Sequence, residues 1–598
     1  MVKAPAFSAA QALGLVLLLW ALCSAGLIYT TWHFIAPLNF RDPDDALRLV
    51  QVRDLLAGQS WFDATQHRIF PPDGVPMHWS RLVDLPIALV LGLLQPLLGP
   101  AIAERVTLVI VPLVLLLLLA LALYKMVRHL GRGRGTALVA VTLLMSSPAI
   151  LIQFAPTRID HHGMQILFGA LGALALVRSD RHDGRLGLIA GLAMACWLQI
   201  SIEGLPCAVV MGVIYGLRHI CRTDRWADLR AYMLALTGGS AVLLFGTHYP
   251  ADAIVPWCDS LSPAYLGPLA AATIALLVAH HMLPADNMVP RMTPLAIAGG
   301  VGLASFLAVS RQCLAGPFDT LDPMVYNLWY LAVREGLPIT AQSPDLQAMI
   351  VAPSLLGLLG NFLGWHRAPD GHMRQAWLSL LLLQIAAFAL SLTLMRAMSY
   401  AHLLALPGNA MMLAGLMSAT QRLTIMPLRV AFTAATAIVT PFGSASAAAA
   451  ALDNSQATHA PATTPPRFRC TTYDTLRGLD ALPKATLFTP LDIGAHMLVY
   501  THHAVVATGH HRNAAGMKTV LTGLTASPDA ARAIVTASGA RYVVYCDGEN
   551  EVAKYSKLYP HSLMAALVAG EIPGWLEPVR MRPGEAVKVY RVVADPRT

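Results

Sequence analysis

The fold is decided by stretches such as RVTLVIVPLVLLLLLALALYKMVRHLGRGRG, residues 105–135. Its first two thirds are almost entirely aliphatic, and a helix of about 20 such residues spans the hydrocarbon core of a bilayer. Lipid offers no partner for free backbone N–H and C=O groups, so the run must be helical. The basic segment that ends it, 125–135, is typical of a cytoplasmic loop. The stretch therefore predicts a transmembrane helix that ends at the cytoplasmic face.

The composition extends this prediction to the whole chain. Of 598 residues, 56% are hydrophobic and only 13% are charged, whereas soluble domains contain roughly 25% charged residues. The formal charge of +8 would also suit a nucleic-acid-binding protein, but Lys and Arg lie mainly between apolar runs and are not clustered with aromatic residues. The sequence therefore predicts a polytopic α-helical membrane protein whose partners include the lipid bilayer and exclude nucleic acid.

Similar apolar runs recur and predict about thirteen transmembrane helices. They lie near residues 11–31, 104–124, 135–153, 163–178, 186–201, 205–218, 231–247, 265–282, 293–310, 346–364, 376–394, 399–418 and 427–447. The first run could instead be a cleaved secretory signal, but its length favours a retained span.

The segments between the spans alternate in charge. Short Arg-rich segments are expected to be cytoplasmic under the positive-inside rule, and they lie at 125–135, 177–185, 217–230, 366–375 and 421–423. The segments expected outside are 32–103, the RIDHHG corner (158–163), 310–346 and everything after about 448. We therefore expect a multi-pass protein of a bacterial-type cytoplasmic membrane.

Beyond the last predicted span the composition changes. We expect a transmembrane domain over 1–447, a small-residue and proline linker over 448–467, and an external α/β domain over 468–598. In that domain the β-type runs ATLFTP, AVVATG, RYVVYC and AVKVYRVV alternate with helical stretches such as SPDAARAIVTASG. Cys470 and Cys546 could form a disulfide there if the compartment is oxidising. The absence of CxxC spacing argues against a cysteine zinc cluster.

Two motifs on the predicted outer side carry titratable residues. Asp42, Asp44 and Asp45 follow the first span, where the alternative to a catalytic role is the acidic start of a helix, favoured by the helix dipole. Asp160 and His162 lie in the RIDHHG corner at the lip of a span, where the alternative is interfacial anchoring. Neither motif identifies a function alone.

Three further residues are candidates on the same side. Glu203 in WLQISIEGLP follows an apolar span, and a carboxylate at membrane depth is usually paired or functional. Glu335 in AVREGLPI has Arg334 beside it, so a salt bridge is the structural alternative. Arg396 in LMRAMSYAHLL lies in a short turn between two spans, and a guanidinium there can bind phosphate through two hydrogen bonds.

Together these residues predict a divalent-cation site. Carboxylate oxygens suit Mg²⁺ or Mn²⁺, and an imidazole shifts the preference toward Mn²⁺. The alternating loops bring Asp42, Asp160 and Glu335 to one side of the membrane, where His162 could join them. These four are the predicted metal ligands.

The order of the motifs resembles that of the class C glycosyltransferases, and within them the catalytic subunit of oligosaccharyltransferases. DPDDALR, PPDGVPMHWSRLVDLP, DHHG, AVREGLP and RAMSY stand at places that correspond to motifs of that family. The resemblance implies a catalytic acid at Asp42, with Asp44 and Asp45 as rivals, and a second acid at Glu335. It also implies metal ligands at Asp160 and His162, and donor-phosphate contacts at Arg396 and Tyr400.

The C-terminal domain departs from that family. Its Trp-Trp-Asp-Tyr-Gly motif is absent, and Asp492 stands in a similar place. His511 and Arg512, in THHAVVATGHHRN, could contact an anionic donor or acceptor, and the alternative is a solvated strand end. The candidate substrate contacts outside the loops with motifs are therefore Glu203, Asp492, His511 and Arg512.

The resemblance predicts a membrane glycosyltransferase that moves a sugar or oligosaccharide from a polyprenyl phosphate or pyrophosphate donor to a glycan, lipid or protein acceptor outside the cytoplasm. A metal-free reaction with an aspartate base and a monosaccharide donor is an alternative within this class. A transporter or flippase for a lipid-linked glycan is a second alternative, which would use intramembrane acids for ion coupling. Such a protein is expected to contain internal repeats, and none is evident in the sequence.

Overall fold

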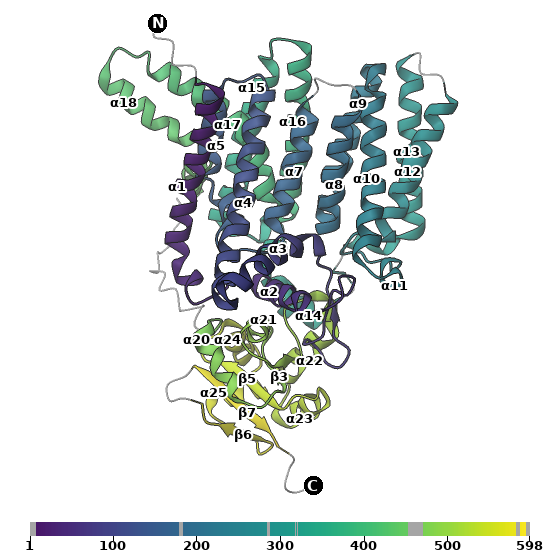
Figure 1. The fold of residues 1–598 in the computed structure, drawn as a ribbon. Coiled ribbons are helices and arrows are strands. Elements are labelled where there is room, and N and C mark those ends of the chain that lie inside the picture. The colour runs from purple at the N-terminus through teal and green to yellow at the C-terminus, as the bar shows by residue number, and fades with distance from the viewer. Residues whose placement is uncertain are drawn as a thin grey trace.

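The computed structural model describes residues 7–178, 183–283, 287–316, 318–319, 321–452, 470–581 and 586–593. A helical bundle and a C-terminal α/β domain are stacked end to end (Figure 1). The predicted fold class, a polytopic helical membrane protein with a C-terminal α/β domain, is confirmed.

The bundle is built from long apolar helices. They are α1 (Ala9–Ile35), α4 (Pro100–His129), α5 (Arg134–Leu144), α7 (His162–Val177), α8 (Arg185–Ile200), α9 (Leu205–Cys221), α10 (Trp226–Thr247), α12 (Pro263–Met282), α13 (Met288–Val309), α15 (Pro344–His366), α16 (Gly371–Thr393) and α17 (Met398–Thr420). By length and composition, the described residues contain 10 candidate spans, or up to 12 if two bent pairs each count as one.

The sequence analysis expected about thirteen spans, and the two sets differ in their members: the candidate spans include α3 (Arg81–Leu98) and leave out two short apolar helices. Two of the expected spans, α7 and α8, have only 16 residues each. Two others are bent: α5 meets α6 (Pro148–Leu151) at 64°, and α18 (Met426–Ala435) meets α19 (Pro441–Leu452) at 88°. A proline opens the second helix of each pair, where its fixed φ suits a helix start but not a continued helix.

Helix α19 also corrects the predicted linker. It continues to Leu452, so the first residues of the segment 448–467 are helical and not linker. The alanine run in this segment favours a helix because alanine loses no side-chain entropy there. The rest of the predicted linker lies outside the described residues.

The segment 32–103 contains more regular structure than a loop. It holds α2 (Pro43–Leu56), the short antiparallel pair β1 (Thr65–Gln66) and β2 (Val75–Pro76), and α3 (Arg81–Leu98). Helix α3 is long and apolar enough to count among the candidate spans, although the sequence analysis placed it in a loop. It lies at the end of the bundle nearest the C-terminal domain (Figure 1).

The C-terminal domain contains a five-stranded sheet in the order β4-β3-β5-β7-β6. Strands β4 (Ala504–Val505), β3 (Thr486–Phe488) and β5 (Tyr542–Cys546) are parallel, and β7 (Val587–Val592) and β6 (Leu576–Val579) complete the sheet in antiparallel pairing. The four predicted β runs are confirmed. Strand β6 was missed because its sequence, LEPV, contains Glu and Pro, which are rare in strands.

Helices cover the sheet and include the one predicted from SPDAARAIVTASG. They are α20 (Tyr473–Leu476), α21 (Leu491–Tyr500), α22 (Ala514–Thr525), α23 (Pro528–Ala537), α24 (Asn550–Leu558) and α25 (Leu563–Ala569). Helix α23 begins with Ser527 at the N-cap, Pro528 in the first turn and Asp529 as a first-turn acid, as expected.

The C-terminal domain is joined to segment 32–103 by direct pairing. The backbone N–H of Phe70 donates to the carbonyl of Val505, and the N–H of Val505 donates to the carbonyl of Arg68, both at 2.9 Å. Arg53 donates to the carbonyl of Val499 at 2.6 Å. Apolar residues of α2 and of α21 share one buried core. The first segment and the domain therefore form a continuous unit below the bundle.

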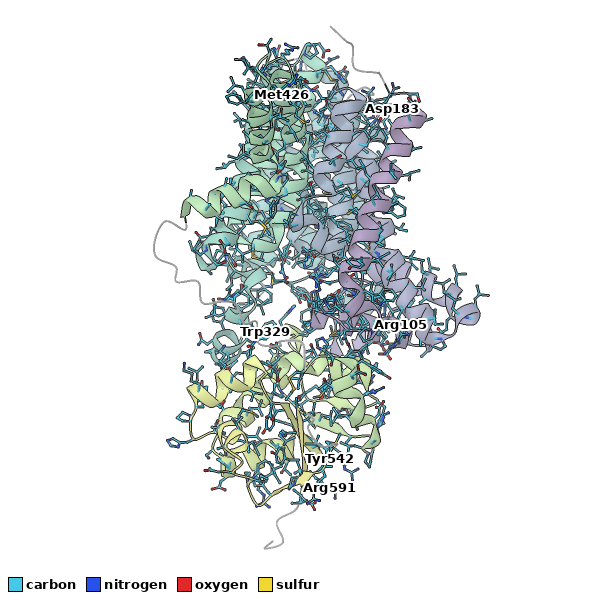
Figure 2. The ribbon with its side chains drawn as sticks, turned by 90° about the vertical axis from the view of Figure 1, so that its left-hand side faces the viewer. Arg105, Asp183, Trp329, Met426, Tyr542 and Arg591 are labelled. Carbon is cyan, nitrogen blue, oxygen red and sulfur yellow. A yellow bond between two sulfur atoms is a disulfide. The ribbon has the colours of Figure 1, made fainter. Side chains whose placement is uncertain are left out.

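Charge and cysteine chemistry separate the two ends of the molecule. Asp183 and Met426, beside Arg-rich segments, lie at the end of the bundle away from Tyr542 and Arg591 of the C-terminal domain (Figure 2). The disulfide Cys470–Cys546 lies in the C-terminal domain, and Cys258–Cys313 lies at the end of the bundle next to that domain, since Asp259 binds His511. Disulfides persist in oxidising compartments. Both signals lead us to expect the C-terminal domain outside the cytoplasm.

Labelling of cysteines tests this orientation. Cys221, at the far end of α9, is an exposed free cysteine, and Lys557 is an exposed residue of the C-terminal domain. We expect a membrane-impermeant maleimide to label Lys557→Cys in intact spheroplasts but to label Cys221 only after permeabilisation, because the Arg-rich end faces the cytoplasm. Labelling of Cys221 before permeabilisation would contradict the orientation.

Candidate active site

A cavity of about 1290 Å³, open to solvent, lies between the bundle and the C-terminal domain. Its lining includes the predicted site residues Asp42, Asp44, Glu203, Glu335, Arg396, Asp492 and His511. A smaller cavity of about 450 Å³ is lined by His162 and Tyr400 and shares Glu203 and Arg396 with the larger one. The structure thus gathers candidates from the first segment, four later segments and the C-terminal domain.

The acidic motif begins helix α2. Asp42 is the N-cap, and its carboxylate accepts a hydrogen bond from the N–H of Asp44 at 3.0 Å. Asp45, in the first turn, accepts hydrogen bonds from the N–H groups of Ile159 and Asp160, both at 2.8 Å. The helix-start interpretation is therefore confirmed for this motif, and the same acids hold the RIDHHG corner against α2.

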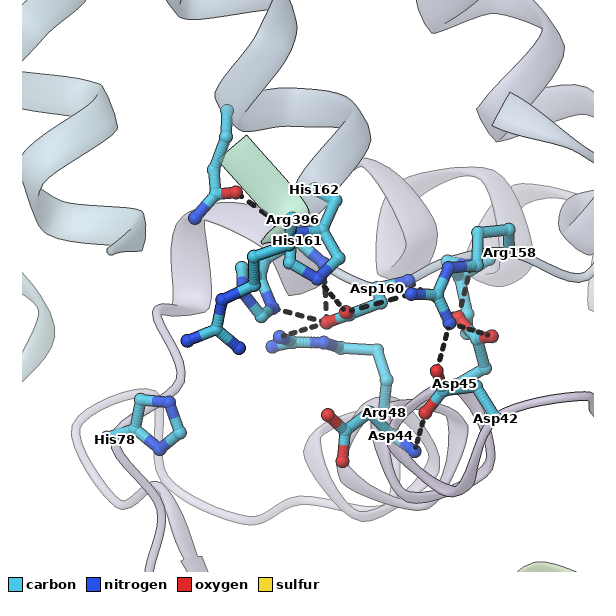
Figure 3. A network of polar contacts seen from close by, with 12 residues as sticks. Asp42, Asp44, Asp45, Arg48, His78, Arg158, Asp160, His161, His162 and Arg396 are labelled. Atoms are coloured by element: carbon cyan, nitrogen blue, oxygen red, sulfur yellow. Dashed lines mark hydrogen bonds and ion pairs between the residues drawn. The ribbon is translucent and has the colours of Figure 1, made fainter. Parts of the chain in front are cut away.

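Arg158 stands at the centre of this cluster, and sequence reasoning missed it. Its guanidinium donates to Asp42 at 2.6 Å and to Asp45 at 3.1 Å, and its Nη2 lies 3.7 Å from Oδ2 of Asp160 (Figure 3). Thr157 precedes it with φ 71°, a left-handed conformation that is unfavourable for a β-branched residue. A basic residue two positions before Asp160 in an apolar corner was the available signal.

Burial and charge separate the acidity of these carboxyl groups. Burial, together with the negative charges of Asp42, Asp160 and Glu335, raises the pKa of Asp44 well above its ordinary value. Burial raises the pKa of Asp45 to about 7. Burial also opposes ionisation of Asp160, but the positive charges of His161, His162 and Arg158 outweigh it and hold its pKa well below the usual range. The cluster thus combines a carboxyl group of lowered pKa, Asp160, with two of raised pKa, Asp44 and Asp45.

Asp160, His161 and His162 form a compact group that could hold a metal ion. Each offers one ligand atom, and these atoms lie within 4.8 Å of one another. Nδ1 of His161 hydrogen-bonds to Asp160, and Nε2 of His162 lies 3.3 Å from Oδ2 of the same carboxylate. Gln165 contacts the other ring nitrogen of His162 at 3.0 Å and so orients it. One oxygen and two imidazole nitrogens suit a transition metal better than Mg²⁺.

Glu335 and Glu203, from distant parts of the chain, both pair with Arg396. Oε1 of Glu335 lies 3.3 Å from Nη1 of Arg396 and 4.0 Å from Nε2 of His162, and Glu203 accepts a hydrogen bond from Nη2 of Arg396. For Glu335 the structural alternative was a salt bridge with Arg334, whereas in the structure it pairs with Arg396. For Glu203 the structural alternative, pairing with an arginine, is confirmed, and the arginine is Arg396.

Of the four predicted metal ligands, Asp160 and His162 are adjacent, whereas Asp42 and Glu335 each face a guanidinium. Tyr400, a predicted donor contact from the RAMSY motif, lies in α17 and donates a hydrogen bond to the carbonyl of Gly169 at 3.1 Å. It therefore lines the smaller cavity from within the bundle.

Asp492 belongs to a second group of acids, in the C-terminal domain. Its backbone N–H donates to Glu551 at 2.8 Å, and Tyr555 donates to the other oxygen of Glu551 at 2.6 Å. Burial and the charge of Glu551 raise the pKa of Glu549 well above its ordinary value, and burial with the charge of Asp492 raises the pKa of Glu551 to about 8. This group is kept partly protonated at neutral pH.

His511 and Arg512 are not at a solvated strand end, so that interpretation is wrong. Both are largely buried and bind Asp259: Nε2 of His511 at 2.6 Å, and two guanidinium nitrogens of Arg512 at 2.8 and 2.9 Å. Asp259 precedes α12, and the sequence analysis did not identify it. Nothing in its local sequence distinguishes it from an ordinary loop acid.

No protein-family model and no curated protein sequence matches the chain. Solved structures do. The oligosaccharyltransferase AglB from Archaeoglobus fulgidus, in complex with an inhibitory peptide and a dolichol-phosphate, is 16% identical over 98% of this chain and 74% of its own, with a TM-score of 0.67. The apo form of the A. fulgidus oligosaccharyltransferase covers 90% of this chain and 70% of its own at 15% identity and a TM-score of 0.66. Its complex with zinc and sulfate covers 97% and 73% at 15% identity and a TM-score of 0.59.

These likenesses identify the fold as that of the class C membrane glycosyltransferases. Within that class, the architecture is the one found in an archaeal oligosaccharyltransferase, with the C-terminal domain included in the superposed length. The identity of 16% or less carries the fold and not the substrate.

Arg158→Ala tests the central ion cluster. The side chain is 13% exposed, and removing one partner of a buried ion pair typically costs about 3–5 kcal/mol. We expect the apparent Tm of the detergent-purified protein to fall by several degrees at pH 7. The loss should be smaller at pH 5, where Asp45, whose pKa is about 7, is protonated. Arg541→Ala, an exposed arginine, is the matched control, and equal Tm values for the two variants would refute the central role.

The acids around Asp492 predict a pH dependence of stability. A carboxyl group whose folded pKa is raised binds its proton more tightly in the folded state, so stability is lost as pH rises from the unfolded pKa through the folded one. For Glu551 that window runs from 4.5 to about 8. The apparent Tm should therefore fall between pH 6 and pH 8.5, and Glu551→Gln should reduce this fall.

The exposed Glu571→Gln serves as control and should keep the wild-type pH dependence. A fall of the same size in wild type and Glu551→Gln would mean that other groups cause it.

Proposed function

We propose that the protein is a membrane glycosyltransferase that transfers a sugar or oligosaccharide from a polyprenyl phosphate or pyrophosphate donor to an acceptor outside the cytoplasm. The observation that carries this proposal is the meeting, at one cavity, of the acids of α2, the Asp160–His161–His162 group and the Glu203–Arg396–Glu335 group. The class C glycosyltransferase fold supports the same reaction class.

The α2 acids differ in their fitness as a general base. Asp45 is buried, and both of its oxygens are already engaged, by backbone N–H groups and by Arg158. Asp42 and Asp44 line the cavity. Asp42 is already bound by Arg158, whereas burial and neighbouring negative charge raise the pKa of Asp44 above its ordinary value, which makes its carboxylate the stronger base. Asp44 is therefore our first choice for activating the acceptor, and Asp42 the second.

Arg396 is the residue we assign to the leaving phosphate. Its guanidinium is held between Glu203 and Glu335 and lines both cavities, so it is oriented before a donor arrives. A guanidinium can donate two parallel hydrogen bonds to phosphate. The dolichol-phosphate in the AglB complex supports a lipid phosphate as the ligand of this region.

Asp160, His161 and His162 fit a divalent cation by donor type and spacing. When bound, such a cation supplies positive charge that stabilises the departing phosphate. The ion is proposed as Mn²⁺ or Mg²⁺, with Mn²⁺ favoured by two imidazoles, and the zinc in an AglB complex supports a transition metal. Asp42 and Glu335 are near enough to this group to be influenced by its charge, and each is balanced by a guanidinium.

The acceptor is proposed only as a class. Glycan, lipid and protein acceptors remain open, because the chain lacks the Trp-Trp-Asp-Tyr-Gly motif. Asp492 and His511 reach the cavity from the C-terminal domain and are the residues we assign to the acceptor side, with Arg512 orienting His511 through Asp259.

Transfer from a purified polyprenyl-linked donor tests the proposal. Asp160→Asn keeps the size of the side chain but removes its charge, so we expect a loss of transfer of about 100-fold or more, as for the removal of one group that stabilises charge in the transition state. Asp73→Asn, at an exposed position of the same segment as α2, should retain wild-type transfer. Equal activity of the two variants would contradict the proposed site.

Chelation distinguishes the metal-dependent reaction from the metal-free alternative. We expect transfer to stop in excess chelator and to return with Mn²⁺ at least as well as with Mg²⁺. Full activity in chelator would favour an aspartate base with Arg396 alone at the phosphate. Movement of the lipid-linked glycan across vesicle membranes without transfer would favour the flippase.

A further inference from the structure

We propose that His78, His510 and His511 bind a zinc ion in the wall of the cavity, at the junction between segment 32–103 and the C-terminal domain. This site is separate from the Asp160–His161–His162 group and does not depend on the proposed transfer reaction. It shares no ligand with that group.

The three imidazoles come from two distant parts of the chain and meet closely. Each offers one ring nitrogen, and these atoms lie within 4.8 Å of one another. Nδ1 of His78 is 2.9 Å from Nε2 of His510. The ring centroids of His78 and His511 are 4.7 Å apart, and those of His510 and His511 are 5.0 Å apart. Nitrogen atoms at this spacing can bind one ion after small shifts of the side chains.

One ligand already has the outer partner that metal-bound histidines usually have. Such a histidine commonly donates its second ring N–H to a carboxylate, which fixes the ring and its tautomer. Nε2 of His511 contacts Asp259 at 2.6 Å, which leaves Nδ1 of that ring for an ion. Asp259 is itself held by two hydrogen bonds from Arg512.

The residues around Asp259 are themselves held in place by further contacts. The guanidinium of Arg512 lies 4.2 Å from the ring centre of Trp257. Cys258, next to Asp259, is bonded to Cys313. The two residues that precede Asp259 are thus held by Arg512 and by a disulfide, which restricts the backbone from which Asp259 reaches His511.

The charge state of the cluster suits a cation. A histidine binds a metal through the lone pair of a deprotonated ring nitrogen. An anion would need positive charge, but Asp259 neutralises Arg512. Three imidazoles are the ligand set of three-histidine zinc sites, which keep a fourth position open. The cavity contains all three residues in its lining, so this position would face the cavity.

A metal at this place would connect parts that otherwise meet through hydrogen bonds and apolar contact. His78 follows β2, whereas His510 and His511 precede α22. The ion would therefore fix the C-terminal domain against the first segment beside the cavity.

Cobalt substitution provides the test, because Co²⁺ in a tetrahedral nitrogen site absorbs visible light much more strongly than Co²⁺ in a six-coordinate, oxygen-rich site. The full-length protein, purified in chelator and then desalted, is titrated with Co²⁺, and Zn²⁺ is added in competition. We expect an intense tetrahedral band that Zn²⁺ abolishes. The band should be retained in Asp160→Asn and lost in His510→Ala.

Two further variants separate ligand loss from misfolding. Asp259→Asn should keep the band but weaken Zn²⁺ binding about 10- to 100-fold, the usual effect of losing an outer carboxylate. His502→Ala removes a histidine that pairs with Asp480 outside the cluster and should bind Co²⁺ as the wild type does.

Folded wild-type protein without a tetrahedral band would overturn the proposal, and so would an equal band in His510→Ala. The cobalt band does not depend on whether Asp160→Asn loses transfer activity. Failure of the enzyme assignment and failure of the zinc site can therefore be told apart.

Discussion

The carboxylates of α2 and of the RIDHHG corner converge on a single guanidinium, that of Arg158. Burying several carboxylates together would be costly without such a counter-charge. The pairing joins the first segment to the corner that begins α7. Because the first segment is also paired with the C-terminal domain, Arg158 links the corner that begins α7, through the first segment, to the domain that closes the cavity.

The same logic governs the opposite side of the cavity. Arg396 faces two carboxylates, so the Glu203–Arg396–Glu335 group carries a net negative charge when both acids are ionised. A phosphate that approaches Arg396 must compete with these carboxylates or arrive with additional positive charge. A cation held by Asp160, His161 and His162 would provide that charge close by, since Nε2 of His162 lies 4.0 Å from Oε1 of Glu335.

The sequence predicted what depends on local pattern. Apolar runs gave every helix of the bundle, and alternating loop charge gave the two ends, because both are set by contact with lipid and water. It also predicted which side chains would share one face of the protein. Helix α3 was missed because Arg81, Asp84 and two prolines resemble a loop, and β6 because Glu and Pro interrupt it.

Side-chain contacts between residues far apart in the chain could not be predicted from the sequence. The contact of Asp259 with His511 spans 252 residues, and that of Arg396 with Glu203 spans 193. The sequence singled out His511, Glu203 and Arg396 as candidates but not their partners, because the contacts form only when the fold brings distant segments together. Arg158 was the exception, because its position beside Asp160 was visible and its importance was overlooked.

The pairing between the first segment and the C-terminal domain also sets an order of assembly. Arg68 binds the carbonyl of His503 across 435 residues, and Arg53 binds that of Val499 across 446. Segment 32–103 emerges early in synthesis, whereas strand β4 emerges only after all the helices of the bundle. Contacts between such distant residues form late, because the chain between them must first be ordered. A ribosome-bound chain that has completed its membrane part therefore still lacks a closed cavity, and the site comes into being only when the last domain folds onto the first loop.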